Sequence, residues 1–142
     1  MKNWLRILMA LAATLTIGTA AHAARPSQPM ELFLGNPIET TSGKPLSAVE
    51  AEQAMTRAGA ARGWKITRNA DGTLNAHLPI RKHTLDVTIR IDGRQYDIVY
   101  RDSAVLGYAP NPDDPERPLI HPSYNKWVKT LVSDFTLEFA RQ

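Results

Sequence analysis

The sequence predicts a two-layer α+β protein: a four-stranded antiparallel sheet with two helices on one face, in the chain order α-β-β-β-β-α. Three observations favour it. Segments 47–62 and 122–139 carry apolar residues at helical spacing. Between them, residues 64–101 contain two hairpin signals. The strands alternate apolar and polar side chains, as is typical of an antiparallel sheet with one face in water.

The first helix is predicted to begin at Ser47 and to run to about Arg62. Ser47 and Glu50 have the spacing of a capping box, and Gly63 supplies the left-handed residue that ends a helix. The positions expected to face inward have mostly small side chains, so this helix should lie close to its neighbours. They are Ala51, Ala54, Met55, Ala58 and Ala61.

The first hairpin is predicted to have a three-residue loop, 70–72, with Gly72 in the left-handed position. This loop places Ile66 opposite Ala76 and Trp64 opposite Leu78. A four-residue loop would mix the apolar and polar faces, because a slip of one residue inverts every side chain.

In the second hairpin, Asp92-Gly93 is a type I′ turn signal. The resulting register sets Ile89 opposite Tyr96 and Val87 opposite Ile98. Continued to the end of the sheet, it places His83 opposite Asp102.

The last helix is predicted to begin near Pro122, which suits a first helical turn. Its broad apolar stripe comprises Tyr124, Trp127, Val128, Leu131, Val132, Phe135 and Phe139. We therefore expect a single α+β domain over residues 46–142, preceded by an extended lead-in, 24–45. Within the lead-in, Met30, Leu32 and Leu34 alternate with other residues, which favours an additional edge strand.

Residues 1–23 have the features of a signal peptide. Lys2 and Arg6 precede an apolar run of about eleven residues, and Ala21-His22-Ala23 is a cleavage pattern. The run is too short for a bilayer, which needs about 20 residues, and no later run approaches that length, so no transmembrane segment is expected. The segment therefore predicts export from the cytoplasm.

Cleavage there would lower the Lys and Arg count from 17 to 15 against 14 Asp and Glu, a net charge of +1. A nucleic-acid-binding domain normally carries a clear basic excess, so nucleic acid is not an expected partner. The chain has no cysteine, which excludes disulfides, thiolate zinc sites and a cysteine nucleophile.

Candidate functional residues are predicted to gather at one end of the sheet. They are Arg81, His83, Asp102, Ser103, Tyr108, His121, Tyr124 and Asn125. Two interpretations remain open: a polar network that locks the long 103–122 connection and the last helix onto the strands, or a site for a peptide, a glycan or a small anionic ligand.

Enzymatic and metal chemistry are weakly indicated. Ser103, His83 and Asp102 could form a hydrolase triad, but no strained elbow or glycine-rich oxyanion loop accompanies them, so no catalytic residue is assigned. The histidines lack metal-ligand spacing, and the acidic run 113–116 lacks the glycine turn of a calcium loop. No metal or cofactor is predicted.

Several strings together resemble a family of small exported proteins and lipoproteins from proteobacteria, of uncharacterised function. They are Arg62-Gly63-Trp64, Arg81-Lys82-His83, the YxIxYxDS string at 96–103, and the IHxxYNxWV string at 120–128. The resemblance implies a periplasmic location in a Gram-negative cell. The chain departs from the lipoprotein members in having no lipobox cysteine, which argues against membrane anchoring, and the resemblance supplies no reaction.

The hypothesis from the sequence is a non-enzymatic periplasmic binding or interaction module. Its partner would be an envelope protein, a peptide or a small anionic ligand. The alternatives are an envelope enzyme inhibitor or peptidase-associated module, and a hydrolase that uses Ser103, His83 and Asp102.

Overall fold

The computed structural model describes residues 25–142, and the predicted signal peptide lies outside them. Within these residues the chain forms two helices and two antiparallel sheets, which confirms the α+β class. The elements are β1 (Gln28–Pro29), β2 (Phe33–Pro37), α1 (Ala48–Ala60), β3 (Lys65–Arg68), β4 (Leu74–Ile80), β5 (His83–Asp92), β6 (Gln95–Ala104), β7 (Leu119–Ile120) and α2 (Ser123–Ala140).

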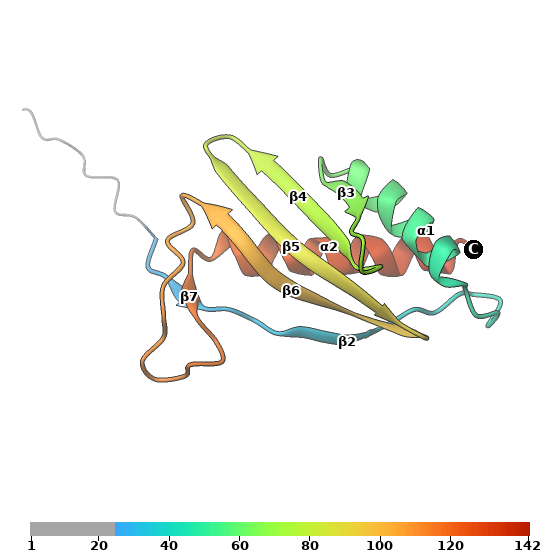
Figure 1. Ribbon diagram of the computed structural model, residues 1–142, viewed down its shortest axis with the longest axis horizontal. Coiled ribbons are helices and arrows are strands. Elements are labelled where there is room, and N and C mark those ends of the chain that lie inside the picture. The colour runs from blue at the N-terminus through green and yellow to red at the C-terminus, as the bar shows by residue number, and fades with distance from the viewer. Residues whose placement is uncertain (1–24) are drawn as a thin grey trace, which may run out of the picture.

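The main sheet has five strands in the order β2-β6-β5-β4-β3, one more than the four predicted. The long helix α2 crosses behind the sheet, and α1 lies at its β3 end, against β3 and α2 (Figure 1). A second sheet pairs β1 with β7 and so joins the lead-in to the segment before α2. None of the helices within residues 25–142 is long and apolar enough to cross a membrane.

The fifth strand comes from the lead-in, but its phase differs from the predicted alternation. Met30 and Phe33 are buried, whereas Leu32 and Leu34 are each 57% exposed. The register between β2 and β6 shifts between Phe33 and Asn36, and Gly35 takes a φ of 65° within this bulge. Residues 32–34 therefore alternate in the opposite phase to the predicted one, and Met30 lies before β2, where its N–H donates to the Pro118 carbonyl.

The capping box of α1 is confirmed. The Ser47 hydroxyl accepts from the Glu50 N–H at 3.2 Å, and the Glu50 carboxylate accepts from the Ser47 N–H at 2.8 Å. The buried face also includes Gly59, where Ala61 was predicted. A Cβ at Gly59 would lie 2.8 Å from Ile66 Cδ1, so the small residues do let α1 approach β3 closely.

The register of the first hairpin is confirmed: Ile66 lies opposite Ala76, and the Asn69 N–H donates to the Thr73 carbonyl at 2.8 Å.

The register predicted for the second hairpin is wrong by two residues. Asp92 pairs with Gln95 and Ile89 with Ile98, so the loop is Gly93-Arg94. Only Gly93 has a positive φ (60°), which matches a type II′ loop with glycine first rather than type I′.

A bulge then changes the far end of this hairpin. Val87 lies opposite Tyr100 but Asp86 lies opposite Asp102, so β6 contains one extra residue there. The predicted pairing of His83 with Asp102 is therefore wrong. A two-residue shift preserves the faces of a strand, and the predicted apolar face does form the core: Leu85, Val87, Ile89, Tyr96 and Ile98 are buried.

Candidate functional site

The eight candidate residues do come from neighbouring segments, but they form separate small groups. The first group is a histidine cluster beside α2. The His83 ring packs against the His121 ring (centroids 6.2 Å apart) and against Trp127 (6.1 Å). His83 Nδ1 donates to the Val105 carbonyl at 2.9 Å, and His121 Nδ1 accepts from the Ser123 N–H at 3.1 Å. Both rings thus secure backbone where the 103–122 connection begins and ends.

The proposed catalytic trio is not linked by hydrogen bonds in the part of the chain that the structure describes. His83 bonds to Val105, and the Asp102 carboxylate accepts from the adjacent Ser103 N–H at 2.8 Å. The Ser103 hydroxyl instead pairs with the Tyr100 hydroxyl at 2.9 Å. A serine hydrolase needs its base to contact the nucleophile, and no such contact joins these side chains.

The second group is aromatic and lies where β6 ends. The rings of Tyr100 and Tyr108 stack almost in parallel, with centroids 4.5 Å apart at 5°. Tyr124, from the first turn of α2, is buried and meets Tyr100 edge-on at 6.1 Å. Burial raises the pKa of Tyr124, and desolvation is also the largest cause of the raised pKa of Tyr100.

Asn125 has a structural task. Its side chain is buried, with Oδ1 accepting from the Glu31 N–H at 2.8 Å and Nδ2 donating to the Pro29 carbonyl at 3.1 Å. It therefore satisfies the Glu31 N–H and the Pro29 carbonyl where the lead-in passes α2.

Arg81 lies apart from the other candidate residues, exposed in the turn between β4 and β5 with a φ of 56°.

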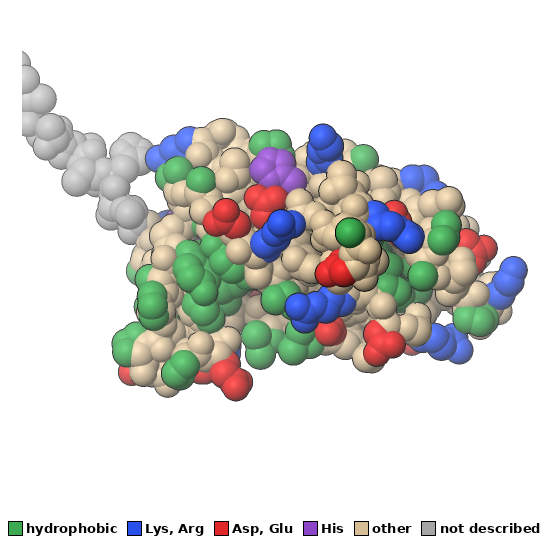
Figure 2. All heavy atoms as spheres, viewed as in Figure 1, with side chains coloured by type: hydrophobic (Ala, Val, Ile, Leu, Met, Phe, Trp, Pro, Cys, Tyr) green, Lys and Arg blue, Asp and Glu red, His purple; other side chains and the backbone are tan. Residues whose placement is uncertain are grey.

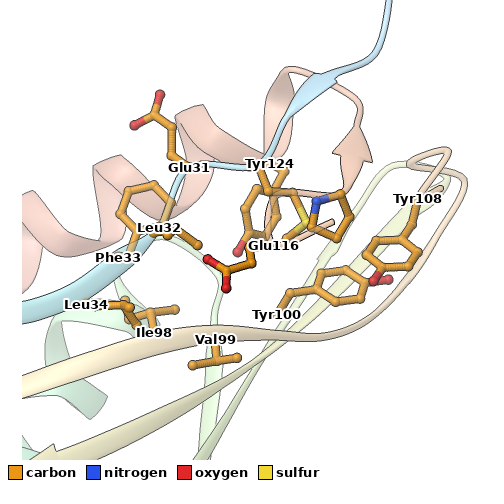
Figure 3. A pocket seen from close by; sticks show the side chains of 12 residues that line it. Glu31, Leu32, Phe33, Leu34, Ile98, Val99, Tyr100, Tyr108, Glu116 and Tyr124 are labelled. Carbon is orange, nitrogen blue, oxygen red and sulfur yellow. The ribbon is translucent and has the colours of Figure 1, made fainter. Parts of the chain in front are cut away.

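One hollow with a largely apolar lining is a groove between β2 and β6. The two strands pair at Phe33 and Ile98 and then diverge, since the lead-in leaves the sheet to join β7. The opening holds a cavity of about 220 Å³. Its lining is Met30, Glu31, Leu32, Phe33, Leu34, Ile98, Val99, Tyr100, Tyr108, Glu116, Pro118 and Tyr124 (Figure 3).

Large apolar side chains reach solvent on both sides of this groove. Leu32 and Leu34 do so on the lead-in, and Tyr108, 47% exposed, does so opposite them. Hydrophobic side chains gather around a hollow at the β7 end of the molecule (Figure 2). Monomeric soluble proteins seldom expose large contiguous apolar patches, and such patches commonly mark interaction sites.

The charged side chains lining the groove are both acidic. Glu31 points away from the cavity centre and forms an ion pair with Lys129 at 3.1 Å. Glu116 points into the groove (Figure 3), and within residues 25–142 no ion pair involves its carboxylate.

Of the eight predicted residues, only Tyr108 and Tyr124 line the groove. The prediction omitted Leu32, Leu34, Val99 and Glu116. One signal could have found Val99: it is the apolar residue on a face of β6 that otherwise carries Gln95, Asp97 and Arg101. Glu116 has no comparable signal, since only the course of the long connection brings it to the sheet.

The opposite, polar face of the sheet carries a separate pair. His77 Nδ1 lies 3.0 Å from the Asp86 carboxylate, and Asn75 donates to the same oxygen at 3.4 Å. Asp86 also lies opposite Asp102. No group of three or more histidine, aspartate or glutamate side chains in the described part of the chain could hold a metal ion.

Comparison of the chain with family models, with curated proteins and with solved structures finds no match. The resemblance to small exported proteobacterial proteins therefore stays a prediction.

Proposed function

We propose that the protein is a non-enzymatic binding module of the periplasm, and that it holds an apolar part of its ligand in the groove between β2 and β6. The observation that carries the proposal is the exposed apolar rim around a cavity. Solvent exposure of Leu32, Leu34 and Tyr108 costs free energy in the unbound protein, and a ligand that covers them would recover it.

The polar groups near the groove support binding rather than catalysis. The hydroxyls of Tyr100 and Ser103 satisfy each other, and the Asp102 carboxylate is bonded to its own neighbour. His83 is engaged by the Val105 carbonyl. None of these groups is arranged as a base beside a nucleophile, which is the geometry that acyl transfer requires.

Titration with N-phenyl-1-naphthylamine, a neutral apolar fluorophore, tests the groove. We expect a saturable rise in fluorescence. Tyr108→Ala should weaken binding about fivefold or more, because an aromatic contact contributes about 1 kcal/mol. Leu137→Ala is the matched control, since Leu137 is 60% exposed on α2 and does not line the groove. An unsaturable signal, or equal affinity in the Tyr108 variant, would contradict the proposal.

Export is the second part of the proposal, and it rests on the signal-peptide pattern of residues 1–23. In a Gram-negative host, we expect intact-mass measurement of the periplasmic fraction to find a chain that begins near Ala24. Recovery of the protein from the cytoplasm with Met1 retained, and none from the periplasm, would show that the segment is not a signal peptide.

A further inference from the structure

Only part of the β6 edge beside the groove is paired with another strand. The pairing of β2 with β6 reaches Ile98 and goes no further, whereas β6 continues to Ala104 with β5 on its other side. Among residues 25–142, no strand lies beside residues 99–104 on the β2 side. The sheet therefore has a place for one more short strand segment, at the groove.

The backbone of Tyr100 should face this empty place. Along an antiparallel strand, every second residue directs its N–H and C=O groups toward the same neighbour. Tyr96 and Ile98 pair with β2, so Tyr100 is the next residue with backbone groups on that side. Unpaired edge groups of this kind accept an added strand, which gains main-chain hydrogen bonds there.

The size of the cavity favours a peptide over a free small molecule. Sites for drug-sized ligands are typically about 300–1,000 Å³, and this cavity holds about 220 Å³. That volume suits one or two side chains of a segment whose backbone lies outside, along β6. The apolar walls from Phe33, Tyr124 and Tyr108 suit aliphatic or aromatic side chains.

The charge of the groove favours a peptide that carries a basic residue. Glu116 has no ion-pair partner within the described residues and points into the groove, and no Lys, Arg or His contributes to the lining. We infer that the ligand is an extended segment of another protein, with alternating apolar residues and a basic residue, which adds to β6 beside Tyr100 and places its cation near Glu116. This inference rests on the proposed function of the groove.

The test uses a short capped peptide of alternating valine and threonine with one central lysine, followed by NMR on the full mature chain. We expect the Tyr100 amide to shift and its hydrogen exchange to slow when the peptide binds. The same peptide with proline in place of one valine should bind at least about tenfold more weakly, because proline removes a main-chain donor and disfavours a paired strand.

Glu116→Gln tests the charge. Replacing the peptide's lysine by glutamate should weaken binding to the wild type about fivefold, the effect of turning an exposed attraction into a repulsion. In Glu116→Gln, the two peptides should bind within about twofold of each other. Glu39→Gln is the matched control, because it removes one negative charge from an exposed position outside the groove lining and should preserve the fivefold difference.

The outcomes separate the two proposals. If the fluorophore binds in the groove and neither peptide does, or the proline peptide binds as well as its parent, the peptide inference is wrong and the groove remains a binding site. If neither probe binds, both fail. A concentration-dependent dimer in analytical ultracentrifugation that involves the β6 edge and resists the peptide would identify a second copy of this chain as the occupant, which also overturns the inference.

Discussion

Replacing Phe135 by alanine is expected to lower the free energy of unfolding by about 3–5 kcal/mol, the usual range for truncating a buried aromatic side chain. Phe135 is fully buried, and its ring meets Tyr96 edge-on at a centroid distance of 5.7 Å. It also lies 6.3 Å from Phe139, so its loss opens a cavity between α2 and the sheet. Urea denaturation followed by tryptophan fluorescence measures the change.

The control for this variant is Leu137→Ala on the same helix. Leu137 is 60% exposed, so its truncation should change the free energy of unfolding by no more than about 0.5 kcal/mol. Equal midpoints for the wild type and the Phe135 variant would mean that α2 is rotated from the described position.

A steep loss of stability above pH 10 is the second expected result. Burial raises the pKa of both Tyr96 and Tyr124 above the ordinary value of about 10. The folded protein therefore keeps both phenols neutral while the unfolded chain ionises, so stability is full below pH 10 and falls as the pH rises further. The loss is about 1.4 kcal/mol per pH unit for each tyrosine, or about 4 kcal/mol for both at pH 11.5.

Urea midpoints at pH 9 and pH 11.5 measure this loss, with Tyr96→Phe as the control variant. The Tyr96 hydroxyl is buried and has no hydrogen-bond partner among residues 25–142, so its removal should not destabilise the protein at neutral pH. The variant should show about half the alkaline loss. An unchanged loss would assign the effect to other groups.

The faces of the sheet could be predicted from the sequence better than its ends could. Alternation assigned Leu85, Val87 and Ile89 to the core, and this is confirmed. A shift of two residues leaves those faces intact, so the pattern could not reveal that the loop is Gly93-Arg94. The error grew at the bulge opposite Asp86, and it separated His83 from Asp102.

The groove could not be predicted because it depends on chain paths rather than on local pattern. It exists because the lead-in pairs first with β7, through β1, and reaches β6 only at Phe33. Pairing of segments so distant in sequence has no periodicity to reveal it. Of the predicted residues that meet there, Tyr124 comes from the first turn of α2, whose start was predicted correctly, and Tyr108 comes from the long connection after β6.

The hydrogen bonds between the lead-in and α2 affect the order in which the domain folds. Asn125 holds Glu31 across 94 residues, and Thr41 donates to the carbonyl of Ala140 across 99. Contacts between the two ends of a chain raise the contact order. They can stabilise the fold only after a large loop has closed, and closing that loop costs conformational entropy. A chain that is still emerging from a ribosome lacks α2, and with it Phe135, Phe139 and the partner of the lead-in. The domain can therefore complete its core only when the last turn of α2 has left the ribosome, because Phe139 in that turn is fully buried.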